Sequence, residues 1–384
     1  MIHRDAEQEL RLLAQQFRAV VVTGPRQAGK TTLVRKVFDA KPYVSLENPD
    51  VRKFALEDPR GFLSGFPHGA VLDEVQRAPE LFSYLQQILD ERNEAGLFIL
   101  TGSNNFLLQE SISQSLAGRT GTLFLLPLGL NELALSDSNS NLRIIQGGFP
   151  AIHAAKTDVG RFYANYIRTY VERDVRLLRN ISDLYAFERF LRLCAGRVGQ
   201  LLNMNSLATE TGVDMKTVAS WIGILETSFV LFRLQPYHKN FSKRIVKTPK
   251  LYFYDTGLAA SLLGISSAND LSVSPYRGNL FENLVVLEFL KNQINFGKTT
   301  RLYFWRDNTG HEVDLLLDSG KALLPVEVKS GKTIIHDFFS GVRYWMKLTG
   351  APRAWIIYDG EEWQNRSDGC SVVPLRDLPS AKIV

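Results

Sequence analysis

Residues 19–38 read AVVVTGPRQAGKTTLVRKVF, and this stretch decides the fold of the first third of the chain. Its first five residues are apolar and mostly β-branched, as in a strand buried inside a parallel sheet. The next eight have the spacing G-x-x-x-x-G-K-[ST], and the residues that follow have helical character. Glycines let backbone N–H groups wrap around phosphates, and a helix N-terminus favours negative charge. The stretch therefore predicts a P-loop that binds ATP through Gly24, Pro25, Arg26, Gln27, Ala28, Gly29, Lys30, Thr31 and Thr32.

Two side chains of this loop have separate expected roles. Lys30 is expected to reach the β- and γ-phosphates, and the Thr31 hydroxyl is expected to ligate Mg²⁺. The alternative is a chance match in an unrelated loop. The strand before the motif and the helix after it argue against that alternative.

A second strand ends in two acids. Residues 69–74 read GAVLDE, an apolar run followed by Asp73 and Glu74, which is the Walker B arrangement. Asp73 is expected to hold Mg²⁺ through water, and Glu74 to orient and activate the attacking water. The alternative is a strand that ends in a solvated acidic turn.

A third strand is expected at residues 97–104, where polar residues again follow an apolar run. Ligands of open α/β sheets lie at the carboxyl ends of the strands, so Ser103 or Asn104 is expected to sense the γ-phosphate or position water. Arg119 then precedes an expected strand at residues 122–126, where an arginine finger would lie. It could act on the γ-phosphate of its own chain or of a neighbouring subunit; we predict the second, which would imply a homo-oligomer. The alternative is a surface arginine in a glycine-rich turn.

The middle of the chain is basic. Residues 161–250 contain 15 Lys and Arg against 7 Asp and Glu, which indicates a polyanionic partner or a solvated basic face. A helix that ends at Gly212 and a second that begins after Asp214 predict a helix-turn-helix. Strands at residues 229–234 and 250–254 would form a wing. Its tip would carry Lys239, Lys243 and Arg244, suited to sequence-independent contacts with DNA phosphates. Alternatively, the wing only packs internally or meets a protein.

The last third carries a set of charged residues on an expected helix and three expected strands. Glu282 lies early in the helix at residues 278–290; Asp314 and the pair Glu327-x-Lys329 lie on strands. Asp314 and Glu327 are expected to share a Mg²⁺ ion, because carboxylates on adjacent strands can ligate it together. Lys329 shares a strand face with Glu327 and is expected to help deprotonate or position the attacking water. These residues resemble the PD-(D/E)xK nuclease core, and the alternative is a fold of this kind kept only for binding.

The ordered set of motifs resembles the AAA+-type ATPases of bacteria and archaea that carry a C-terminal domain of unassigned function. The resemblance covers nearly the whole chain. It rests on residues 24–32, 46–50 (LENPD), 72–76 (LDEVQ), 100–103 (LTGS), 116–119 (LAGR), 147–150 (GGFP), 170–174 (YVERD) and 254–258 (YDTGL). It implies an α/β ATPase domain with a parallel sheet at residues 1–155, a helical linker and winged helix at 156–258, and a restriction-endonuclease-like α/β domain at 259–384.

The composition bears on the cellular location of the protein. Two cysteines without metal-ligand spacing and no apolar run of about 18 residues favour a cytoplasmic protein with no membrane segment. The leading hypothesis is an enzyme that uses ATP and Mg²⁺ to act on DNA. The rival is a nucleotide-gated regulatory protein whose C-terminal part only binds DNA or a protein. A scaffold that merely holds ATP is weaker, because it needs no base such as Glu74.

Overall fold

The computed structural model of the chain describes residues 2–103, 115–133, 139–155, 157–171, 183–238 and 246–379. The first 133 residues contain a parallel sheet with helices on both faces. Their elements are α1 (Glu7–Gln16), β1 (Ala19–Gly24), α2 (Lys30–Val37), β2 (Tyr43–Ser45), α3 (Pro49–Glu57), α4 (Pro59–Ser64), β3 (Val71–Asp73), α5 (Leu81–Glu91), β4 (Phe98–Ser103) and β5 (Thr120–Phe124). Every strand pair is parallel, in the order β2-β3-β4-β1-β5.

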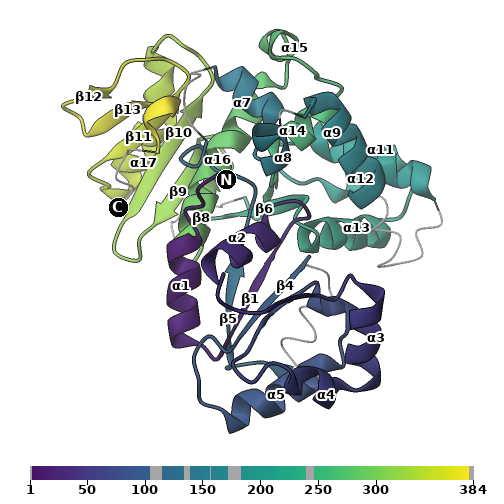
Figure 1. Cartoon of the computed structure of the whole chain (residues 1–384). Coiled ribbons are helices and arrows are strands. Elements are labelled where there is room, and N and C mark those ends of the chain that lie inside the picture. The colour runs from purple at the N-terminus through teal and green to yellow at the C-terminus, as the bar shows by residue number, and fades with distance from the viewer. Residues whose placement is uncertain are drawn as a thin grey trace.

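Both faces of the central strand β1 are buried, which explains its unbroken apolar run. Val20 and Val22 pack in a cluster with α1 and α2, whereas Ala19 and Val21 pack in a second cluster with α4 and α5. Successive side chains of a strand point to opposite faces, so one strand serves both layers. The predicted α/β domain with a parallel sheet is confirmed (Figure 1).

Helices dominate the middle of the chain. They are α7 (Ser140–Gln146), α8 (Pro150–Ala154), α9 (Val159–Tyr166), α11 (Leu184–Ala195), α12 (Met204–Thr211) and α13 (Met215–Thr227), followed by β6 (Leu231–Pro236), β7 (Lys250–Phe253), α14 (Thr256–Leu262) and α15 (Ala268–Ser272). As expected, α12 ends at Gly212 with φ 82°, and the Asp214 side chain caps α13 by accepting from the backbone N–H of Lys216 and Thr217. Strands β6 and β7 pair antiparallel.

The basic tip of the expected wing, with Lys239, Lys243 and Arg244, lies outside the described residues, as does Asn104. The last lysine of the basic run does not belong to an exposed basic surface. Lys250 is only 3% exposed and lies inside the protein. The winged-helix description of this part stays a prediction.

The C-terminal part contains a second sheet. Its elements are α16 (Arg277–Asn295), β8 (Leu302–Arg306), β9 (Glu312–Asp318), β10 (Leu323–Lys329), α17 (Ser340–Thr349), β11 (Ala354–Tyr358), β12 (Gln364–Asn365) and β13 (Cys370–Pro374). The expected hairpin is present, since β8, β9 and β10 pair antiparallel in sequence; β11 then joins β10 in parallel after α17. The sheet order is β12-β13-β11-β10-β9-β8-β6-β7, so the two strands of the middle part extend this sheet.

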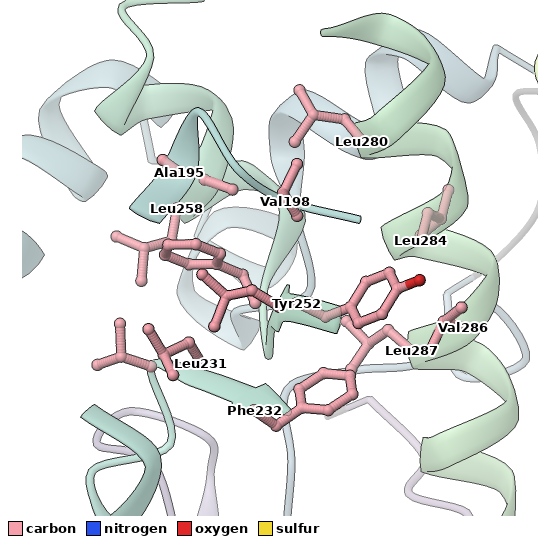
Figure 2. Close-up of a cluster of buried hydrophobic side chains, with 14 of the residues drawn as sticks. Ala195, Val198, Leu231, Phe232, Tyr252, Leu258, Leu280, Leu284, Val286 and Leu287 are labelled. Atoms are coloured by element: carbon pink, nitrogen blue, oxygen red, sulfur yellow. The ribbon is translucent and has the colours of Figure 1, made fainter. Parts of the chain in front are cut away.

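One hydrophobic cluster joins the middle and C-terminal parts. Figure 2 shows side chains of β6, β7 and α14 facing leucines of α16, among them Leu231, Leu258, Leu280 and Leu284. Helix α14 also lies across the boundary predicted at residues 258 and 259. The two parts therefore share a core, and the domain limits given above stay a prediction.

Candidate ATP-binding site

The loop between β1 and α2 has the backbone that its glycines predict. Gly24 has φ 148° and Gly29 has φ 91°, both outside the range that L side chains adopt easily. A Cβ atom on Gly24 would also overlap the carbonyl oxygen of Leu125. Gln27 takes a left-handed conformation with φ 60°, which is uncommon for a residue with a side chain. Positive φ values at these three positions are of the kind found in anion-binding loops.

Lys30 begins α2 and lies within this loop. The residue is 7% exposed, and its ammonium donates to the carbonyl oxygens of Gly24 at 3.0 Å and Pro25 at 2.8 Å. Burial lowers the pKa of Lys30 to about 8. A phosphate beside this ammonium would favour the charged form and raise the pKa again, so the geometry fits an anionic ligand.

Asp73 is the centre of a hydroxyl network at the carboxyl edge of the sheet. Thr31 Oγ1 lies 3.1 Å from each carboxylate oxygen, and Thr101 donates to the same carboxylate. Tyr43 donates to Asp73 Oδ2 at 2.6 Å; burial raises the pKa of Tyr43 to about 12, and the bond to Asp73 acts in the same direction. A carboxylate beside a threonine hydroxyl is a hard oxygen donor set of the kind that Mg²⁺ prefers, so Thr31 and Asp73 fit the predicted ion.

Glu74 follows β3 in a strained conformation. Its backbone lies in the left-handed region, with φ 57° and ψ 44°. Residues held in such regions cluster at active sites. Gln76 Nε2 donates to Glu74 Oε2 at 2.5 Å and to Ser103 Oγ at 3.2 Å, so one amide joins both predicted residues. Gln76 ends the LDEVQ motif, and nothing in the local sequence predicts this role for it.

Arg4 supports the loop from the N-terminus of the chain. Its buried guanidinium donates to the carbonyl oxygens of Ala28 and Leu126, at 2.6 Å each, and to Glu132 at 2.9 Å. Arg4 therefore ties the P-loop to the segment after β5. Sequence reasoning missed this residue, because its partners lie up to 128 positions away.

A mostly apolar pocket of about 300 Å³ opens beside the P-loop. It lies between the N-terminal segment, the first turns of α2, the segment after β5 and helix α8. Its lining includes Ile2, Arg4, Gly29, Thr32, Leu33, Leu128, Pro150 and Ala154. Pro150 ends the GGFP motif, so that motif contributes a wall of the pocket.

Arg119 does not join the other predicted residues within the chain. Its backbone oxygen accepts from the N–H of Ala19, at the amino end of β1. The six-residue strand between that end and the P-loop spans about 17 Å. The guanidinium forms an exposed, two-point ion pair with Asp90, at 2.6 and 2.9 Å. Arg119 is thus excluded from its own chain's phosphate site.

The charged residues of the C-terminal part do come together, but with an additional lysine. Lys250 Nζ lies 3.0 Å from Glu282, 2.5 Å from Glu312 and 3.8 Å from Asp314. Lys329 Nζ lies 2.8 Å from Glu327 Oε1. Burial raises the pKa of Glu327 to about 8, and the repulsion of Asp314 adds to it. Within the described residues, no group of three or more His, Cys, Asp or Glu side chains is arranged to hold a metal ion.

Relatives with curated sequences cover nearly the whole chain. The "Uncharacterized protein Rv2008c" of Mycobacterium tuberculosis is 32% identical over 379 residues, which is 98% of this chain and 84% of that protein. The "Uncharacterized protein Mb2031c" of Mycobacterium bovis matches with the same values. The chain belongs to the family of these two mycobacterial proteins.

Three domain models match successive parts of this family member. An AAA domain matches residues 16–134, a domain of unknown function (DUF8612) matches 138–269, and another (DUF4143) matches 277–378. The first match agrees with the P-loop and the parallel sheet and supports an AAA-type ATPase-like domain in this part of the chain. The other two matches leave the winged-helix and nuclease-like predictions untested.

Solved structures match this chain at low similarity. The Walker-type ATPase PABY2304 of Pyrococcus abyssi is 13% identical with a TM-score of 0.44, covering 67% of this chain and 94% of its own. The RuvB Holliday junction branch migration motor of Thermotoga maritima is 18% identical with a TM-score of 0.31, covering 60% of this chain and 90% of its own.

None of the described helices combines the length and apolar character needed to cross a membrane.

Proposed function

We propose that this chain binds ATP and hydrolyses it with Mg²⁺ at the carboxyl edge of the parallel sheet. The observation that carries the proposal is the convergence of Lys30, Thr31, Asp73 and Glu74 at that edge. The register pairs Gly24 with Ser103 and Leu72 with Leu100, which brings the P-loop, Asp73 and Ser103 to neighbouring strand ends. Glu74 supports hydrolysis rather than binding alone, since a carboxylate next to the metal-holding acid can act as a base.

Each residue has one task in this mechanism. The loop N–H groups and the Lys30 ammonium bind the β- and γ-phosphate oxygens and stabilise the charge that develops on them. Glu74 takes a proton from the attacking water, and its amide partner Gln76 holds the carboxylate in place beside Ser103. Thr31 and Asp73 would hold Mg²⁺, which supplies further charge neutralisation when bound.

The adenine base is proposed to occupy the apolar pocket beside the P-loop. Ala154 is exposed on α8 and lines this pocket, so Ala154→Phe would fill the space with an aromatic ring. We expect the Kd for ATP to rise at least about tenfold, a loss of about 1.4 kcal/mol. Inorganic tripolyphosphate uses only the loop, so its Kd is expected to stay within about twofold. Isothermal titration of both ligands measures this.

The matched control is Ala155→Phe, which adds the same ring at the next exposed position, outside the pocket lining. It is expected to bind ATP like the wild type. If Ala154→Phe binds ATP with unchanged affinity, the adenine base does not bind in this pocket. A parallel loss of tripolyphosphate binding would mean that the substitution disturbs the loop itself.

We propose further that Arg119 acts on the ATP of a second copy of the chain. Its distance from its own P-loop supports action on a neighbouring subunit, and the exposed ion pair with Asp90 can open to release the guanidinium. Specific activity is then expected to rise with protein concentration. Chains with Arg119→Ala and chains with Lys30→Ala, each inactive, should recover activity on mixing, because one supplies the loop and the other the arginine. Activity that is flat on dilution and absent in the mixture rejects the role in trans.

A contact between α16 and the segment after β5 supports the hypothesis of a nucleotide-gated regulatory protein. Lys291 on α16 donates to the carbonyl oxygen of Leu128 at 2.8 Å, and Glu288 on the same helix accepts from the N–H of Leu130 at 2.7 Å. Leu128 also lines the proposed adenine pocket. Helix α16 therefore contacts, near its C-terminal end, a segment that lines the proposed adenine pocket, and it carries Glu282 near its N-terminal end. We propose that ATP binding is transmitted along it to a unit that binds DNA or a protein; the DNA phosphate contacts expected of Lys243 and Arg244 remain part of this proposal.

A further inference from the structure

The acidic residues of the C-terminal part surround a cation that belongs to the chain itself. Three carboxylates face the Lys250 ammonium within 4 Å, those of Glu282, Glu312 and Asp314. Lys250 is 3% exposed, so this ammonium is removed from water and compensated by the carboxylates rather than by solvent. Glu282 and Glu312 lie within hydrogen-bonding distance of the ammonium, whereas Asp314 forms a longer ion pair with it at 3.8 Å.

The two acids expected to share a metal have separate partners. Asp314 faces Lys250 with one oxygen and accepts the backbone N–H of Val328 at 2.9 Å with the other. Glu327 pairs with Lys329 at 2.8 Å. Glu312 has a second cation in Arg306 at 3.2 Å. Three basic side chains therefore offset most of the charge of the four carboxylates and leave one net negative charge. Among the described residues, Glu327 Oε2 is buried without a hydrogen-bond partner.

The position of Lys250 is fixed by the fold. The residue begins β7, where its backbone pairs with Leu234 of β6 and bridges to Leu201 on the other side. Two positions further along β7, Tyr252 donates to the same Glu282 oxygen as Lys250, at 2.5 Å. Figure 2 shows the Tyr252 hydroxyl directed toward α16. A strand paired on both sides presents this side chain to the acids in a defined way.

We propose that Lys250 is the resident cation of this acidic cluster, that it excludes divalent metal ions, and that replacing it opens a divalent-cation site formed by Glu282, Glu312 and Asp314. The C-terminal part then acts without metal-dependent cleavage of phosphodiesters. Hydrolysis in this family member is confined to the AAA-type domain. The inference does not depend on the proposed ATPase activity, because it concerns a different sheet and different residues.

The test counts bound Mn²⁺ without nucleotide, from the electron paramagnetic resonance signal of the free ion. The variants are Asp314→Asn, Lys250→Met and the double variant, compared with the wild type. Methionine keeps the length of the lysine chain but removes the charge. Wild type and Asp314→Asn are expected to bind Mn²⁺ equally, because neither has a metal at the cluster. Lys250→Met is expected to bind about one further Mn²⁺ per chain, and the double variant to lose it again.

Two results overturn the proposal. One is a Mn²⁺ ion in the wild type that disappears in Asp314→Asn, which would place a metal beside Lys250. The other is a folded Lys250→Met variant that gains no Mn²⁺. Circular dichroism reports whether Lys250→Met folds. If it does not fold, the comparison of bound Mn²⁺ between the wild type and Asp314→Asn still tests the proposal. Nicking of supercoiled plasmid by the wild type with Mn²⁺, lost in Asp314→Asn, would equally contradict it.

Discussion

ATP turnover by a Lys30→Ala variant is expected to fall by at least about 10²-fold relative to the wild type, the loss seen when one preorganised electrostatic group is removed. The ammonium donates to two carbonyl oxygens of the P-loop, and we propose that it faces the β- and γ-phosphates. Because burial of this ammonium is itself unfavourable, its removal is not expected to unfold the domain. Phosphate release and thermal unfolding, measured on the same preparation, separate these two effects.

Lys53→Ala is the matched control. Lys53 lies on α3 with an exposed side chain and a long ion pair to Glu57 at 3.8 Å. The same change there is expected to leave turnover at the wild-type rate. Turnover near the wild-type rate in Lys30→Ala as well would place the phosphate site elsewhere in the molecule.

A Glu74→Gln variant is expected to bind ATP like the wild type but to hydrolyse it about 10²- to 10⁴-fold more slowly, the usual contribution of a general base. The amide keeps the size of the carboxylate and can still contact Gln76, but it cannot accept a proton from water. Single-turnover measurement of bound ATP with this variant tests the chemical step directly, since product release does not enter.

Glu80→Gln makes the same substitution six positions along the chain, at an exposed residue before α5. It is expected to be fully active. If Glu74→Gln loses affinity and not rate, the residue contributes to binding and is not the base. If both variants are active, another group activates the water.

The nucleotide site could be predicted largely from local sequence, because each part depends on residues that are neighbours in the chain. The glycines of the P-loop define its backbone. A short β-branched run such as residues 19–23 is typical of a strand that is buried on both faces of a parallel sheet. The parallel order then brings Asp73 and Ser103 beside the loop. The helix ending at Gly212 and the cap at Asp214 were predictable for the same reason.

What escaped prediction depends on contacts between distant segments. In the sequence, Arg4 is one of several charged residues near the N-terminus. Its contribution to the P-loop is seen only in its contacts with Ala28, Leu126 and Glu132. The sequence places Lys250 in a basic run, but strand pairing turns its side chain into the protein toward Glu282. Proximity in sequence to other lysines says nothing about which face of a strand a lysine occupies.

The most direct test of the central claim is phosphate release from ATP by the purified wild-type chain, with and without Mg²⁺, using Lys30→Ala as the blank. We expect phosphate release that requires Mg²⁺, saturates with ATP, and exceeds the blank by at least about 10²-fold. Release that is equal in the wild type and the blank, or independent of Mg²⁺, would contradict it.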